Sequence, residues 1–194
     1  AAVATALVTA LFAEGFDRWY AARIAAAAAA LVLVRRSLPR LEPRAAILPI
    51  LIGAAVCALW LLPSGGEGAG AYEGMSRLSA GERWLWVAGR VLGSCLVVPV
   101  VEELAFRGFL LPWLVRPDFE RVAPRAWTWP ALLLSSLAFG ALHSHWLLGA
   151  AAGMAFAAAR LHRGRLEDAI LAHAVANAGV AVAVLTAGRW DLWG

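Results

Sequence analysis

The chain has 194 residues, 62% of them hydrophobic, and its mean hydropathy of +0.71 is too apolar for an ordinary soluble domain. Its net charge of +4 at pH 7 and its pI of about 10.0 come from arginine, since the sequence contains no lysine. The arginines lie mostly between apolar runs, as in the loops of a membrane protein, so we expect a lipid bilayer and no nucleic acid as partner.

Seven apolar segments follow one another, and they predict an all-α, polytopic transmembrane helix bundle of about seven to eight helices forming one domain over residues 1–194. In chain order they are 1–13, 20–34, 45–62, 84–115, 128–145, 146–160 and 167–187. Cys57 and Cys95 lie in apolar runs without metal-binding or redox spacing, so we expect buried free thiols. The chain lacks a charged region and cleavage site of the signal-peptide type.

The segment 84–115 is the longest, at roughly 48 Å if helical, which exceeds a hydrocarbon core of about 30 Å. It is therefore expected to tilt, kink or break, with Pro99 and Pro112 as the places. Ser79 stands three residues before Glu82 in the polar stretch that precedes this segment, a capping-box pattern that predicts a helix start there. Pro130 suits the first turn of the helix expected over 128–145.

The distribution of arginine among the loops predicts the orientation of the chain in the membrane. Loops 35–45, 116–127 and 160–166 hold ten arginines, against five in 14–23, 63–83 and the C-terminal tail. The positive-inside rule therefore places the first set of loops in the cytoplasm. We expect an integral, multi-pass protein of a bacterial inner membrane.

Glu102, Glu103 and Arg107 lie in the middle of the apolar stretch 97–114. Ionisable side chains at membrane depth cost several kcal/mol unless they are paired or hydrated, which makes them a functional-site hypothesis. On a helix Glu103 and Arg107 are four residues apart and can pair, whereas Glu102 points about 100° away.

Two later segments carry polar groups that can face Glu102. The first ends in Phe139-Gly-Ala-Leu-His143, and the second holds His173 and Asn177 on one helical face. Counted from the cytoplasmic ends, Glu102 and His143 lie at similar depths, ~21 and ~22 Å, but His173 lies at only ~9 Å. We expect the turn at 161–166 to be recessed into the bundle, which would carry His173 deeper.

A carboxylate, two histidines, an amide and an arginine in one hydrated site suit hydrolysis. Glu102 can act as general base on water, a histidine can orient that water, and a second histidine with Asn177 can donate to the oxyanion. The sequence has no HExxH, GxSxG or GxGD motif. Glu102, His143 and His173 offer an alternative as ligands of a divalent metal such as zinc, although we expect no cofactor.

The motifs EExxxR, FxxxH and HxxxN, in this order on three apolar segments, resemble those of the CAAX-protease and bacteriocin-processing family of intramembrane endopeptidases, also called Abi or Rce1-like. The resemblance covers a core at 84–187, with the helices of 1–62 as accessory elements. The stretch around Glu102 is also similar to members associated with exosortase-type protein sorting.

The resemblance implies an all-helical enzyme that cuts a membrane-anchored protein or peptide. It implies Glu102 as general base, Glu103 and Arg107 as its partners, and His143 as the residue that orients the water. His173 and Asn177 would be the oxyanion pair, and Phe106 and Phe139 would shape the substrate pocket. It leaves open a glutamate or a metal-dependent mechanism.

Less specific interpretations remain for each feature. Glu103 with Arg107 alone is commonly a structural pair, and an intramembrane histidine commonly bonds between helices. Gly149 and Gly153 form a GxxxG pattern that indicates helix packing. Rival functions are a non-catalytic scaffold or immunity protein, and a small transporter that uses Glu102 for proton coupling, although no inverted repeat is evident.

Overall fold

The computed structural model describes residues 16–38, 46–62 and 69–193, and every regular element within these ranges is helical, as predicted. The predicted span 1–13 lies outside them. The helices are α2 (Tyr20–Val34), α3 (Ile47–Trp60), α4 (Ala69–Ser76), α5 (Ala80–Leu92), α6 (Val98–Glu103), α7 (Leu111–Val115), α8 (Trp129–Gly140), α9 (Trp146–Arg163) and α10 (Leu166–Ala187).

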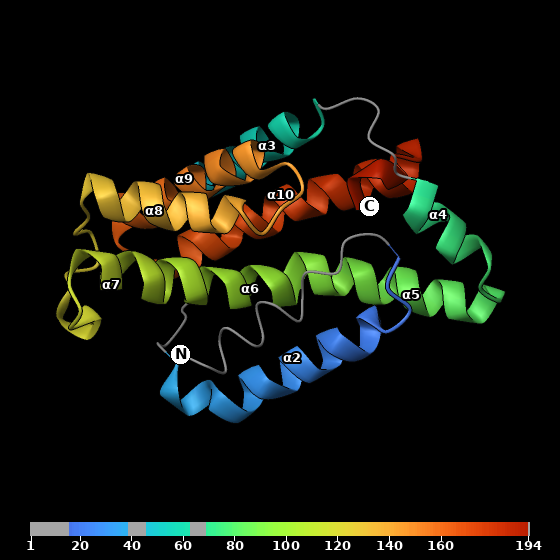
Figure 1. Cartoon of the computed structure of the whole chain (residues 1–194), viewed down its shortest axis with the longest axis horizontal. Helices are drawn as coiled ribbons and strands as arrows, with labels where there is room; N and C mark the ends of the chain where they lie inside the picture. The colour runs from blue at the N-terminus through green and yellow to red at the C-terminus, as the bar shows by residue number, and fades with distance from the viewer. Residues whose placement is uncertain (1–15, 39–45, 63–68, 194) are drawn as a thin grey trace.

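Helices α5, α6 and α7 are parts of one continuous helix over Ala80–Val115, which does not break at either proline (Figure 1). Ahead of each proline lies a π-helical segment, Gly93–Val97 or Leu104–Leu110. Proline removes one helix N–H and its ring clashes with the preceding turn, and the wider π turn accommodates both effects. Of the expected outcomes of tilt, kink or break, a break does not occur, and each proline is preceded by a local expansion of the helix.

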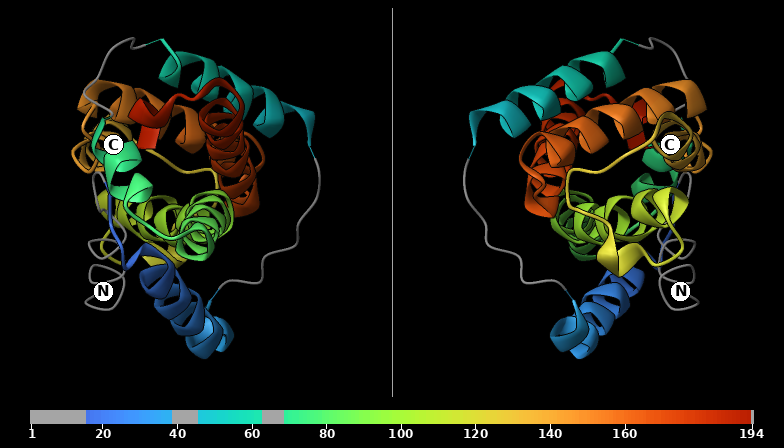
Figure 2. Two further views of the ribbon diagram at one scale, coloured as in Figure 1. Left: turned by 90° about the vertical axis from the view of Figure 1, so that its right-hand side faces the viewer. Right: turned by 90° about the vertical axis from the view of Figure 1, so that its left-hand side faces the viewer.

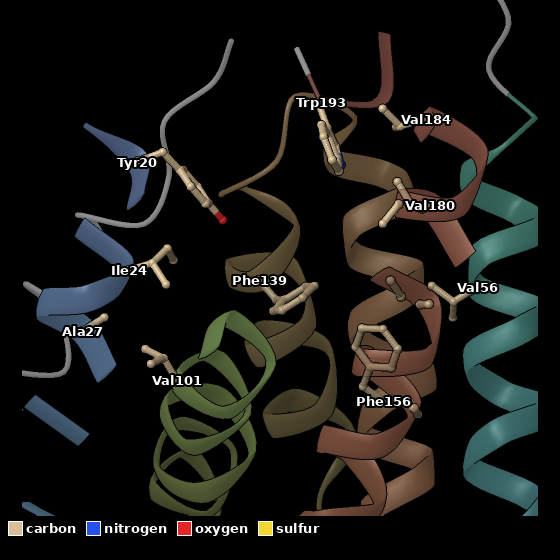
Figure 3. Packing of buried hydrophobic residues seen from close by; sticks show 14 of the residues in the cluster. Tyr20, Ile24, Ala27, Val56, Val101, Phe139, Phe156, Val180, Val184 and Trp193 are labelled. Atoms are coloured by element: carbon tan, nitrogen blue, oxygen red, sulfur yellow. The ribbon is translucent and has the colours of Figure 1, made fainter. Parts of the chain in front are cut away.

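This long helix divides the bundle. Figures 1 and 2 show α2 on one side of it and α3, α8, α9 and α10 on the other. Tyr20, Ile24 and Ala27 of α2 are buried, and Figure 3 shows them on the side of α2 that faces the long helix, where Val101 lies. α3 packs closely along α10, since a Cβ on Gly53 would lie 2.3 Å from the carbonyl oxygen of Ala172.

Capping residues explain where three of the helices begin or end. The predicted capping box is present, because the Ser79 side chain accepts from the Glu82 N–H and Glu82 accepts from the Ser79 backbone. Thr128 caps α8 and Pro130 occupies its first turn. α9 ends at Gly164, whose φ of 72° is a left-handed conformation that glycine adopts without strain.

Two segments differ from the predictions. α4 forms within the stretch expected to be a polar connector, although its glycines weaken helical propensity. α8 ends at Gly140 and not near 145, so His143 lies in a turn. The backbone at Gly140 packs closely against the first turns of α9. A Cβ on Gly140 would lie 2.3 Å from the carbonyl oxygen of Trp146 and 2.6 Å from the nitrogen of Ala150.

The exposed surface is rich in apolar side chains. Ala80–Val115 and Leu166–Ala187 are long and apolar enough to cross a membrane, and α2, α3 and α8 are shorter apolar helices. Leu33 and Ile47 are 84% and 77% exposed, and large apolar side chains are exposed along α3, α5 and α8 as well. Exposed apolar faces of this extent fit contact with lipid.

Candidate active site

The two adjacent glutamates of α6 are the centre of the site. Glu102 and Glu103 are 1% and 0% exposed, in a helix otherwise made of apolar residues at this level. Carboxylates buried to this extent require compensating partners. The two side chains differ sharply in the partners that they have.

Glu103 is the hub of a polar network between three helices. Its Oε1 atom accepts from Arg107 Nη1 at 3.2 Å, which confirms the predicted pairing, and lies 2.9 Å from His173 Nδ1 of α10. Arg107 Nη2 donates to the carbonyl oxygen of Gly153 in α9 at 2.7 Å. The network therefore fixes the spacing of α6, α9 and α10 around a single carboxylate oxygen.

Glu102 has a different environment. Its Oε2 atom has no hydrogen-bond partner among the described residues and lies 3.9 Å from His173 Nε2. His173 thus faces Glu103 with one ring nitrogen and Glu102 with the other. The structure brings Glu102 and His173 together from segments about 70 residues apart, while the expected recess of the turn at 161–166 stays a prediction.

Aromatic rings enclose the histidines. Phe156 stacks on the His173 ring with centroids 4.6 Å apart, and Phe139 meets the same ring edge-on at 5.8 Å. Phe139 also lies 4.9 Å from the His143 ring and 5.2 Å from the Phe106 ring. The two phenylalanines expected to shape a pocket, Phe106 and Phe139, therefore pack against each other, and Phe139 separates the two histidines.

His143 is held by its own turn. Its Nδ1 atom lies 3.0 Å from the carbonyl oxygen of Phe139, so Nδ1 carries the proton and donates to it. In the neutral ring this leaves Nε2 with a lone pair. The ring meets Trp60 of α3 at 5.5 Å, edge to face.

Asn177 lies one turn after His173 on α10. Its Nδ2 atom donates to the carbonyl oxygen of Ser94 in the first π-helical segment at 2.7 Å. One N–H of the side-chain amide is thereby engaged and a second N–H remains on the same nitrogen. The predicted site residues thus come from the long helix, from α8 and the turn after it, and from α10.

Four residues of this site had no functional role in the sequence-based prediction: Trp60, Ser94, Gly153 and Phe156. Gly153 belongs to the GxxxG pattern, which does pack helices, since Gly149 lies against Gly140 and Gly153 against Ser136. A Cβ on Gly153 would also lie 3.2 Å from Arg107 Nη2. Ser94 acts through its backbone, which no side-chain pattern reveals.

The alternative of a metal site at Glu102, His143 and His173 stays a prediction. The Nδ1 atoms of His173 and His143 bond Glu103 and the Phe139 carbonyl, contacts that metal-bound histidines also make. Within residues 16–38, 46–62 and 69–193, no group of three His, Cys, Asp or Glu side chains converges as a metal-binding set. We therefore derive no catalytic step through a metal.

The sequence matches the model of a known protein family. A family model described as Type II CAAX prenyl endopeptidase Rce1-like matches residues 83–179, half of the chain. Searches of curated proteins and of solved structures found no match. The matched residues include all three motifs, and the exposed apolar helices fit a protein of the bilayer. The chain therefore belongs to the Rce1-like family of CAAX prenyl endopeptidases and is an intramembrane protease.

Proposed function

We propose that the protein hydrolyses a peptide bond in a membrane-anchored protein or C-terminal tail, with Glu102 as the general base. The observation that carries this proposal is the contrast between adjacent carboxylates. Glu103 is engaged by Arg107 and His173 through Oε1, although its Oε2 atom has no hydrogen-bond partner among the described residues. The Oε2 atom of the equally buried Glu102 has none either, and it lies 3.9 Å from His173 Nε2. Two carboxylates in such different environments suit different tasks, one structural and one catalytic.

In the first step a water molecule between Glu102 and the substrate loses a proton to the Glu102 carboxylate. The water oxygen forms a bond to the carbonyl carbon, and the carbonyl electron pair moves onto oxygen to give a tetrahedral oxyanion. The Nε2 lone pair of His143 accepts the second hydrogen of the water and orients it. The proposed proton transfer contributes on the order of 10²–10⁴-fold to the rate.

The oxyanion is stabilised by His173 and by the remaining N–H of Asn177. His173 Nδ1 faces Glu103, so Nε2 can donate when the ring is an imidazolium opposite that carboxylate. In the second step the C–N bond breaks, the oxyanion electrons re-form the carbonyl, and the leaving nitrogen takes the proton held by Glu102. The products are a carboxylic acid and an amine, and Glu102 is regenerated.

The test uses the full chain in proteoliposomes with two fluorescence-quenched peptides. One ends in a prenylated cysteine followed by three residues, and the other carries a transmembrane anchor in place of the prenyl group. We expect the wild type to cleave at least one peptide, and Glu102→Gln to lose at least about 10²-fold in kcat while keeping its thermal stability. Gln is isosteric, and the Glu102 Oε2 atom has no hydrogen bond to lose among the described residues.

The matched control is Glu73→Gln, since Glu73 is exposed on α4. Wild-type cleavage by Glu102→Gln would remove the proposed base. Loss of folding by Glu102→Gln, with no cleavage of either peptide by the wild type, would favour a scaffold.

We further propose a multi-pass topology in a bacterial inner membrane with the 116–127 and 160–166 loops in the cytoplasm. The arginine distribution supports this orientation. A C-terminal reporter that is active only in the cytoplasm is expected to be silent. An active reporter would reverse the orientation.

A further inference from the structure

We infer that Pro99 is a positioning residue for catalysis, because it frees the backbone carbonyl of Ser94 to hold the Asn177 side chain. The inference rests on the proposed role of Asn177 as an oxyanion donor. Pro99 lies in the first turn of α6, three residues before Glu102, and is buried. Ser94 lies five residues before Pro99, within the π-helical segment Gly93–Val97.

The hydrogen bonds of this segment leave the Ser94 carbonyl without a backbone donor. In a helix the carbonyl of Ser94 accepts from the N–H of residue 98 in α geometry or of residue 99 in π geometry. The Val98 N–H donates to the carbonyl of Gly93, five residues back. Position 99 is proline, which has no N–H.

Ser94 is half-buried, and Asn177 supplies a donor to its carbonyl. The Asn177 Nδ2 atom lies 2.7 Å from the Ser94 carbonyl oxygen, across 83 positions of sequence. This bond consumes one N–H of the amide and fixes the plane of the amide group, so that the direction of the second N–H is fixed too. π turns inside α-helices occur frequently at functional sites, in agreement with this role.

Pro99→Ala reverses this arrangement. Alanine restores an N–H that competes with Asn177 for the Ser94 carbonyl, or lets the segment return to α geometry in which Val98 donates to Ser94. In both cases Asn177 loses its fixed acceptor. Because alanine is the best helix former, the helix itself is expected to remain stable.

The experiment is a double-mutant cycle between Pro99→Ala and Asn177→Ala in the proteoliposome assay, with whichever of the two peptides the wild type cleaves faster. We expect Pro99→Ala to lower kcat about tenfold with little change in KM, as for loss of one hydrogen bond expressed in the transition state. In the Asn177→Ala background we expect Pro99→Ala to have no further effect on kcat. The control is Pro130→Ala in the first turn of α8, which is expected to retain wild-type kcat.

The outcomes distinguish the inference about Pro99 from the proposed oxyanion role of Asn177. Equal losses of kcat from Pro99→Ala in the wild-type and Asn177→Ala backgrounds would show that Pro99 does not act through Asn177 and would overturn the inference. Wild-type kcat in Pro99→Ala would overturn it as well. Wild-type kcat in Asn177→Ala would instead remove the oxyanion role, which belongs to the proposed function.

Discussion

The Nη2 atom of Arg107 lies 2.7 Å from the carbonyl oxygen of Gly153, and this bond joins the long helix to α9 at the level of the catalytic network. The approach depends on the absence of a side chain at position 153. A Cβ there would lie 3.1 Å from Ser136 Cα and 3.2 Å from Arg107 Nη2. The glycine therefore determines how closely Arg107 approaches α9, and through it where Glu103 lies.

Gly153→Ala tests this dependence. We expect the methyl group to displace Arg107, to cost about 1–3 kcal/mol of stability through overpacking, and to lower the cleavage rate. Thermal denaturation in detergent and the peptide assay measure the two effects. Gly81→Ala is the control, because a Cβ at that exposed helical glycine would meet nothing within 4 Å. Equal behaviour of the two variants would contradict the packing argument.

Glu103→Ala is expected to be among the most destabilising single changes in the protein. It leaves Arg107 buried without its carboxylate, and breaking a buried ion pair costs about 3–5 kcal/mol. The double variant Glu103→Ala/Arg107→Ala should lose less stability than the sum of the two single variants, since the second change removes the unpaired charge. Additive losses of the denaturation midpoint would show that the two groups do not depend on each other.

The role of His143 can be tested with two amides of different length. Asparagine can reproduce the bond from Nδ1 to the Phe139 carbonyl but has no atom near the Nε2 position, whereas glutamine extends an amide to that position. We therefore expect His143→Gln to retain more activity than His143→Asn, with His143→Asn about 10²-fold below wild type. Higher activity in the asparagine variant would assign the important contact to Nδ1.

Metal removal is expected to leave the cleavage rate unchanged. Among the described residues no group of three His, Cys, Asp or Glu side chains converges as a metal-binding set. The measurement compares peptide cleavage before and after dialysis against a chelator such as phenanthroline. Activity that falls on dialysis and returns with added zinc would contradict this expectation.

Much of the fold was predictable because each helix carries its own signal. The apolar run 20–34 and the capping box at Ser79 correspond to observed helix boundaries. The prolines indicated where the long helix is irregular, but local rules do not specify that the irregularity is a π turn and not a break. α4 was missed because its polar, glycine-rich sequence has weak intrinsic helical preference.

The site was predictable to the extent that its residues are ionisable groups in apolar surroundings. Glu103, Arg107 and His173 are ionisable groups in apolar runs, and this, together with the spacing of His173 and Asn177, marked them as candidates. The Gly153 and Ser94 carbonyls could not be found in this way, because every residue has one and only the tertiary structure shows which are available. Phe156 was indistinguishable from any other core aromatic residue until its ring was seen stacked on His173.

Trp60 touches His143 from α3, which lies outside the segment that defines the family, residues 83–179. The surroundings of this motif histidine are thus completed by a helix that the family match does not cover. Chimeras that exchange this helix while keeping residues 83–179 would alter the ring that contacts His143 without touching any motif residue. A change of substrate preference in such chimeras would assign this contact a role in selectivity.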